Sequence, residues 1–212
     1  MEFVIFYHDL PEYHNYFIFK DLVSCSSDHV ERVEGNEVLL RDGSSYTAKI
    51  IVGSGGHNDP LRRDYWNESS LKIPVKFVLM EGDFGDAVEL HFGSMAPGGY
   101  AWVFPKSSGA NIGLGIQRSF SKGRSLNQYA EEFISKYDGD VTFRGAGSLP
   151  MSGSIRTFVK GNYMLVGDAA GMVLPSNGAG ITIAMIGGRI AGQVIAEPVS
   201  YTHLTLPTNR EV

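Results

Sequence analysis

A glycine-rich turn between an apolar strand and an apolar helix constrains this chain more than any other feature. The strand at residues 164–166 delivers Asp168 to its C-terminal end, where a carboxylate can accept hydrogen bonds from sugar hydroxyls. The helix start after Gly180 points free N–H groups at the same place, which favours an anionic ligand, and small residues let that ligand approach the backbone. The positions concerned are Gly167, Asp168, Ala169, Ala170, Gly171, Pro175, Gly178 and Gly180. A plain strand–helix turn with a solvated aspartate is the alternative.

The chain as a whole contains more glycine than ordinary proteins, and most of these glycines occur in clusters. The 26 glycines are about 12% of the 212 residues, against roughly 7% in ordinary proteins. Twenty of them lie in three windows, 53–56, 93–115 and 145–192. We interpret this concentration as backbone that approaches a ligand closely, because tight turns alone would spread the glycines more evenly.

The first window, Gly53, Gly55 and Gly56, follows the apolar strand 50–52. It is no dinucleotide fingerprint, because residue 58 is asparagine where the third glycine would stand. It is either a tight turn near a cofactor or a plain glycine-rich loop. Residues 53–63 are predicted to be irregular, since they are rich in glycine and proline.

The second window contains an aromatic stripe. Tyr100, Trp102 and Phe104 would point to one face of a strand, and Pro105 follows. Such a stripe forms a flat apolar wall for a ring system or a lipid, but it is equally typical of core packing. Gly113 and Gly115 fall on one face of the next strand, where they would leave room for something planar.

The remaining periodicity predicts a mixed α/β chain. Residues 29–52 read as a hairpin or meander that includes 46–52 as its last strand. Apolar spacing over 125–137 predicts an amphipathic helix with Ser125 as its N-cap, and residues 178–196 read as a buried helix. Further strands are expected at 75–80, 87–92, 100–104 and 111–116, in a sheet with one covered face, and a short segment at 141–143 follows the helix.

Composition excludes several classes of protein. The net charge of -5 argues against nucleic acid as a partner, and the single cysteine, Cys25, excludes an internal disulfide framework and a cysteine-based metal site. We expect no metal. The N-terminus lacks a signal peptide pattern, and the uncharged stretch 169–188 is too rich in glycine and too interrupted for a membrane span. We therefore expect a cytoplasmic protein.

Three motifs in order resemble one family of flavoproteins. The turn at 167–171 with its following proline and glycines is similar to the G-D-A-A-G…P…G-x-G motif of FAD-dependent oxidoreductases related to aromatic hydroxylases. Together with Y-x-W-x-F-P at 100–105 and N-x-G-x-G at 111–115, it resembles the geranylgeranyl reductase branch. The segment Gly147-Ser148-Leu149-Pro150 is also similar to an element of that branch. The resemblance covers roughly residues 30–197.

The resemblance implies an α/β fold: an incomplete Rossmann-like FAD/NAD(P)-binding domain with an inserted antiparallel β-sheet domain for the substrate. Residues 1–70 would be part of the FAD-binding domain, residues 71–147 the substrate domain, and residues 148–198 the return to the first domain. The N-terminal G-x-G-x-x-G unit for the ADP half of FAD would be missing, so we expect a fragment truncated at both ends. Residues 199–212 resemble translated adapter sequence and are expected to be non-native, with an ordinary polar tail as the alternative.

The resemblance also implies roles for particular residues. Asp168 would hold the ribityl chain of FAD, and the helix start at 178–180 would face the flavin N1–C2=O edge. The small residues of the turn and the loop at 53–56 would pass near the cofactor, although many relatives carry an acidic residue where Gly55 stands. The substrate cavity over the flavin would be lined by Tyr100, Trp102, Phe104 and Pro105.

The leading functional hypothesis is an FAD-dependent oxidoreductase that reduces C=C bonds of a prenyl lipid, with NAD(P)H or another reductant as electron donor. The alternatives are a flavin-dependent monooxygenase on the same scaffold, an inactive fragment, or a lipid-binding module without redox activity. An apolar substrate also suggests peripheral membrane contact. No catalytic acid or base is nominated, because lone histidines such as His57 and His91 are more often plain polar residues.

Overall fold

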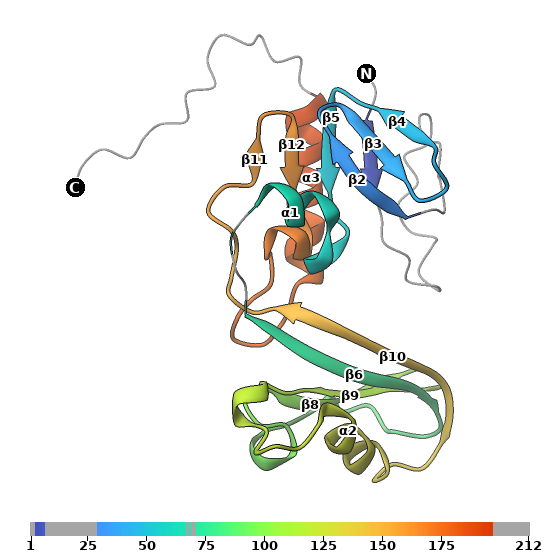
Figure 1. Ribbon diagram of the computed structural model, residues 1–212. Helices are drawn as coiled ribbons and strands as arrows, with labels where there is room; N and C mark the ends of the chain where they lie inside the picture. Colours follow the sequence, from blue (N-terminus) through green and yellow to red (C-terminus); the bar gives the residue numbers. More distant parts are fainter. Residues whose placement is uncertain (1–2, 7–28, 67, 69–70, 197–212) are drawn as a thin grey trace, which may run out of the picture.

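The computed structural model describes residues 3–6, 29–66, 68 and 71–196, the first four by their backbone alone. Cys25 and the predicted non-native segment 199–212 lie outside the described residues. The described strands form three sheets, and two long strands lead from the part of the molecule that holds α1 and α3 into the lower sheet (Figure 1). The mixed α/β class predicted from the sequence is confirmed.

A small, mostly parallel sheet holds the strand that precedes Asp168. Its order is β1-β5-β12-β11, with β1 at Phe3–Phe6, β5 at Ile50–Gly53, β12 at Tyr163–Leu165 and β11 at Val159–Lys160. β5 pairs in parallel with both β1 and β12. The carboxyl ends of β5 and β12 therefore meet at one edge, which brings the loop after Gly53 next to the turn after Leu165.

A separate three-stranded sheet contains β2 (Val30–Glu34), β3 (Glu37–Leu40) and β4 (Ser45–Thr47). The prediction that residues 46–52 form one strand of this meander is wrong, because the chain breaks after Thr47 and β5 joins the parallel sheet. The physical reason is the apolar run 50–52, which suits a strand covered on both faces better than a meander strand with one face exposed to solvent.

The third sheet is antiparallel, with order β10-β6-β9-β8-β7. Its bounds are β6 Lys72–Glu81, β7 Glu89–His91, β8 Tyr100–Lys106, β9 Gly109–Gly115 and β10 Asp140–Pro150. Four of these strands were predicted, and β10 is much longer than the short segment expected at 141–143. The helix α2 (Leu126–Ile134) covers one face, and Ser125 is its N-cap, as the sequence predicted. The structure adds that Gln128 completes a capping box with Ser125.

The prediction that residues 53–63 are irregular is wrong. They contain a 3-10 helix, η1 (Gly56–Asn58), and the start of the helix α1 (Pro60–Tyr65). The physical reason is the Asp59-Pro60 pair, because the Asp59 side chain accepts hydrogen bonds from the N–H groups of Leu61 and Arg62 while Pro60 fits the first helical position. Three other 3-10 helices are η2 (Gly93–Met95), η3 (Arg118–Phe120) and η4 (Gly167–Ala170).

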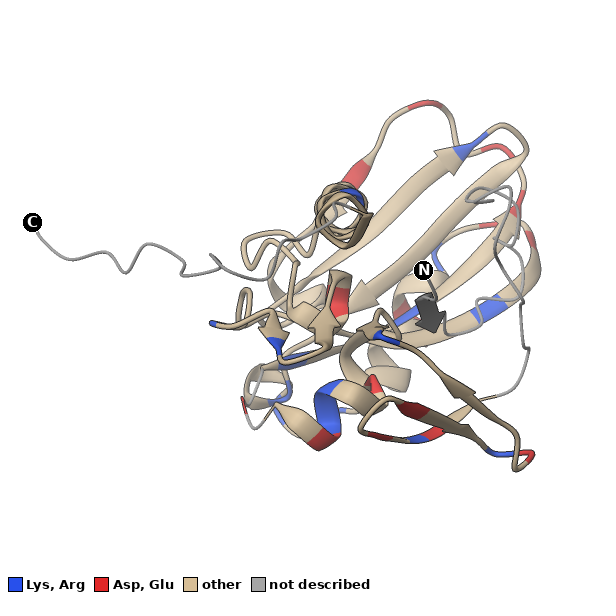
Figure 2. Cartoon of the chain, turned by 90° about the horizontal axis from the view of Figure 1, so that it is seen from above, with Lys and Arg blue, Asp and Glu red and all other residues tan. Residues whose placement is uncertain are grey.

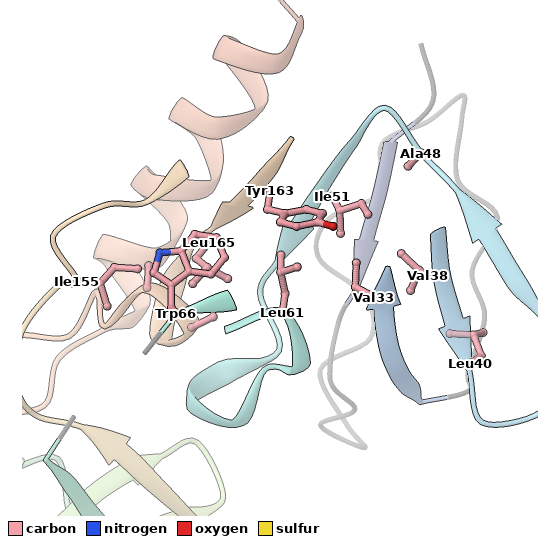
Figure 3. Packing of buried hydrophobic residues seen from close by; sticks show 12 residues of the cluster. Val33, Val38, Leu40, Ala48, Ile51, Leu61, Trp66, Ile155, Tyr163 and Leu165 are labelled. Carbon is pink, nitrogen blue, oxygen red and sulfur yellow. The ribbon is translucent and has the colours of Figure 1, made fainter. Parts of the chain in front are cut away.

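Short α1 closes the core beside the parallel sheet. Leu61 and Trp66 point toward Ile51, Tyr163 and other side chains of β5 and β12 (Figure 3), and all of them are buried. The Trp66 indole N–H donates to the carbonyl of Thr157 at 2.7 Å, so its polar edge is satisfied inside this core.

The last helix, α3 (Ile181–Ala196), was predicted to be buried, and this prediction is wrong for the described structure. Ala191 is the one buried residue of α3. The helix is nevertheless almost free of charge: Arg189 is its one charged residue, and the rest of the helix is tan in Figure 2. The reason is that α3 packs by one side only, near Val52 and Val166. Five of its large apolar residues are exposed: Ile181, Met185, Ile186, Ile190 and Val194. Among the described helices, none has the length and apolar character to cross a membrane.

Candidate functional site

The turn after β12 is built from backbone conformations that require glycine. Gly167 has φ +60° and Gly171 has φ +68°, both in the left-handed region that side chains rarely adopt. A Cβ on Gly171 would also collide with the carbonyl of Gly153. Between these two glycines, Ala169 and Ala170 are fully buried, and they pack into the core that includes Leu61 and Trp66. The packing of these two alanines therefore fixes the turn against the core, and Asp168 lies on the side of the turn that faces away from the core.

Asp168 lies against the start of α3. A Cβ on Gly180 would stand 3.3 Å from the Asp168 Oδ1 atom, so the absence of a side chain at 180 gives the carboxylate its place. Burial raises the pKa of Asp168, because removing a carboxylate from water disfavours its charged form. The turn and the helix start, which the sequence predicted to serve one ligand, are thus brought together.

The glycines at 53–56 contact a residue that sequence reasoning missed. A Cβ on Gly53 would stand 2.6 Å from Leu165 and 2.7 Å from the Asp59 carboxylate, and the Gly55 N–H donates to Asp59 Oδ2 at 2.7 Å. Asp59 is 2% exposed, and burial raises its pKa, while three backbone hydrogen bonds and Arg62 oppose the shift. The Asp-Pro helix-start signal in the sequence could have identified it.

Arg62, one turn further along α1, was also missed. It is 6% exposed, and its Nη1 donates to the carbonyl of Ala169 at 2.8 Å and, less closely, to that of Asp168 at 3.4 Å. A buried guanidinium so close to the predicted cofactor turn links α1 to that turn directly.

The aromatic stripe lies on the face of the five-stranded sheet opposite α2. The rings of Tyr100 and Trp102 are 5.8 Å apart, and those of Trp102 and Phe104 are 5.9 Å apart and stacked, while the intervening Ala101 and Val103 are buried under α2. Gly113 is paired with Trp102, and a Cβ there would stand 2.5 Å from the indole. The room that this glycine leaves is thus filled by Trp102 itself.

A cavity of about 240 Å³ lies between the aromatic face and the loop before α3. Tyr100 and Trp102 line it from β8, whereas Phe104 and Pro105 lie further along the strand and do not. The Tyr100 hydroxyl donates to the carbonyl of Asn177 at 2.6 Å, which ties the sheet to that loop. The lining residues missed by sequence reasoning include Ile73, Val75, Phe92, Gln117, Leu149 and Met151, while Pro175 and Gly178 were predicted for the cofactor.

The two histidines singled out in the sequence lie apart from the cavity lining. His57 Nε2 is 3.2 Å from Ser148 Oγ, and burial, followed by Lys72 and Arg62, lowers its pKa. His91 Nε2 is 2.8 Å from Glu89 Oε2, and its ring packs against Phe133 on the α2 side. In the described part of the chain, no group of three or more histidine, cysteine, aspartate or glutamate side chains is arranged to hold a metal.

The chain resembles known proteins in both sequence and structure. Residues 71–146 match the family model described as "Geranylgeranyl reductase catalytic domain". The chain is 44% identical over 178 residues to digeranylgeranylglycerophospholipid reductase 2 of Methanothermobacter thermautotrophicus, covering 81% of this chain and 43% of that protein. It is 34% identical over 165 residues to digeranylgeranylglycerophospholipid reductase 3 of Methanosphaera stadtmanae, covering 72% of this chain and 41% of that protein.

Among solved structures, the chain is similar to a geranylgeranyl bacteriochlorophyll reductase-like protein from Thermoplasma acidophilum, with a TM-score of 0.65, 25% identity, and coverage of 78% of this chain and 47% of that one. A flavin-dependent halogenase from Brevundimonas sp. BAL3 shares the fold at a TM-score of 0.61 and 17% identity, with coverage of 79% and 37%. The chain thus spans less than half the length of each of these relatives.

Proposed function

We propose that the protein of which this chain forms part or all is a member of the geranylgeranyl reductase family, an FAD-dependent oxidoreductase that reduces C=C bonds of a prenyl lipid. The match of residues 71–146 to the catalytic-domain model and the 34–44% identity to the two reductases support this proposal. One observation carries the proposal: the cavity is lined on one side by Tyr100 and Trp102 and on the other by Pro175 and Gly178 of the predicted cofactor loop. An apolar chain in this cavity would lie between an aromatic wall and the cofactor.

The residues present fit FAD. Glycine at 180 leaves the Asp168 carboxylate its place at the N-terminus of α3, and the turn around it is shaped by two glycines with positive φ. We assign Asp168 to the ribityl hydroxyls and the start of α3 to the pyrimidine edge of the flavin, where the partial positive charge of a helix N-terminus stabilises negative charge. When bound and reduced, FAD would supply a hydride to one carbon of the double bond, and a proton from solvent would complete the other carbon.

The chain's own residues would bind and orient the lipid. Trp102 packs over Gly113 and donates its indole N–H to Asn111 Oδ1 at 2.7 Å, so its orientation is fixed before any ligand enters. Tyr100 is held by Asn177 in the same way. Rigid aromatic rings suit an isoprenoid chain, because they exclude water and lose little conformational freedom on binding. We propose NAD(P)H or another two-electron reductant as donor.

The cofactor proposal is tested by titrating FAD into the purified chain and into its Asp168→Ala variant, with binding followed by equilibrium dialysis. Loss of hydrogen bonds to a carboxylate is expected to weaken FAD binding about 10- to 100-fold. Asp138→Ala, a change at an exposed carboxylate, is the control and should leave binding unchanged. Equal affinity in the Asp168→Ala variant would contradict the assigned role.

The reaction is tested anaerobically with a digeranylgeranyl lipid, FAD and dithionite. We expect each reduced double bond to add two hydrogen atoms to the mass of the lipid. Product that contains oxygen, formed only in air with NAD(P)H, would instead support the monooxygenase alternative.

A further inference from the structure

The two glycine-rich segments that we assign to the cofactor are joined through a single short helix. At one end of α1, the Asp59 carboxylate accepts hydrogen bonds from the N–H groups of Gly55, Leu61 and Arg62. From the first turn of the same helix, the Arg62 guanidinium reaches the turn around Asp168. Both charged side chains are buried, and each is satisfied by backbone groups of the segments that it contacts, which is the condition under which a buried charge is tolerated.

Arg62 supplies what the turn lacks from its own backbone. The carbonyl of Gly167 accepts from the N–H of Met172, that of Asp168 from Gly171, and that of Ala170 from Ile155. The hydrogen bond to the carbonyl of Ala169, at 2.8 Å, comes from Arg62. A buried carbonyl without a hydrogen-bond donor is destabilising, so the guanidinium selects this conformation of the turn over others.

We propose that Arg62 is a positioning residue, which fixes the 167–171 turn so that the Asp168 carboxylate stays directed at the cofactor. This inference rests on the proposed function for the identity of the ligand. Arg62 acts through the backbone of the turn and does not contact the cofactor itself. Its neighbour Arg63 provides a matched comparison, since it lies on the same helix, is largely exposed and pairs with Asp64 at 2.7 Å.

The first arm of the test needs no cofactor. Amide hydrogen exchange is compared among the unaltered chain, Arg62→Met and Arg63→Met under conditions in which all three are folded. We expect faster exchange at Gly171 and Met172 in Arg62→Met alone, with the strands β6 and β9 unchanged. Arg62→Lys, which keeps a positively charged donor group, is expected to recover part of the protection. Protection at these two amides that is equal in all variants would overturn the anchoring role.

The second arm is a double-mutant cycle on FAD affinity, with Arg62→Met, Asp168→Asn and the double variant. Arg62→Met is expected to weaken FAD binding roughly tenfold or more, and to have little further effect once Asp168 is replaced, since it acts through that carboxylate. A purely structural role would lower the melting temperature but leave the two effects on affinity independent. Independent effects would overturn the inference.

Failure of the proposed function gives a different pattern. If the protein of which this chain forms part or all binds no FAD while Arg62→Met still loosens the turn, the cofactor assignment is wrong and the anchoring role stands. If FAD binds and Arg62→Met binds it equally well, the proposed function stands and the positioning role is wrong.

Discussion

The two faces of the five-stranded sheet are made by alternate residues of the same strands, yet they differ in kind. The face under α2 is a continuous apolar core, in which Ala101, Val103, Ile112 and Phe133 are all at most 2% exposed. The opposite face carries larger rings that are only half-buried, and it opens into the cavity beside the predicted cofactor loop. The covered face is closed by packing, whereas the open face keeps its apolar area available to a ligand.

The largest expected effect lies on the covered face. Phe133→Ala should lower the free energy of unfolding by about 3–5 kcal/mol, because it leaves a cavity in a close-packed core. Urea unfolding followed by circular dichroism measures it. Phe120→Ala is the control, since Phe120 is 56% exposed and its loss should cost much less. Equal losses would show that the core under α2 does not carry the stability of this sheet.

A smaller effect is expected where a glycine accommodates an aromatic ring of the open face. A Cβ at 113 would stand 2.5 Å from Trp102 and 2.6 Å from the carbonyl of Lys76, so Gly113→Ala should cost about 1–3 kcal/mol through overpacking. Tryptophan fluorescence should shift as the Trp102 ring moves. At Gly147 the nearest atom to a Cβ is a Val75 methyl at 3.6 Å, and Gly147→Ala should therefore be tolerated. A tolerated Gly113→Ala would mean that the Trp102 ring is not fixed.

The hydrogen bond that links the open face to the predicted cofactor loop should contribute less to the free energy of unfolding. Tyr100→Phe removes the hydrogen bond to the Asn177 carbonyl and is expected to cost about 0.5–1.5 kcal/mol in thermal unfolding experiments. Tyr137→Phe, whose hydroxyl lies 3.3 Å from Glu89 Oε2, is the comparison on the α2 side and should cost less. A larger loss from Tyr137→Phe would reverse the order that we infer.

The smallest effect has the opposite sign and depends on pH. Burial raises the pKa of Asp168 in the folded chain, so its charged form destabilises the fold above that pKa and the cost is relieved as the pH falls through it toward the unfolded value of 3.8. In the absence of flavin, Asp168→Asn should raise the melting temperature slightly at pH 7, and the gain should shrink as the pH is lowered. A gain that is the same at all pH values would point to a cause other than this carboxyl group.

The features that the sequence predicted well are those governed by local rules. The N-cap at Ser125 and the alternation of Tyr100, Trp102 and Phe104 depend on neighbours a few residues away, and both appear as expected. The missed features are of two kinds: α1 and Asp59 carry a local Asp-Pro helix-start signal that was overlooked, whereas the role of Arg62 depends on a distant partner. The contact between Arg62 and the Ala169 carbonyl joins residues 107 positions apart, and no local pattern indicates it.

The site followed the same division. The turn around Asp168 was recognisable because its glycines and alanines occur in an uninterrupted order, whereas Phe92, Gln117 and Leu149 enter the cavity only through the pairing and bending of separate strands. The burial of α3 was overestimated for a related reason. The apolar sequence of a helix indicates that other protein surface packs against it. It does not indicate that this surface belongs to the described residues.

The outward side of α3 has a practical consequence for handling the protein. Ile181 is 81% exposed, and Met185, Ile186, Ile190 and Val194 are each between 45% and 53% exposed. The helix α3 therefore presents an exposed hydrophobic surface along its length. Exposed hydrophobic surfaces of this kind promote association between protein molecules. We expect the sedimentation coefficient of the purified chain to rise with concentration, and mild detergent or Ile186→Lys to suppress that rise. Ligand titrations are therefore best performed at low protein concentration.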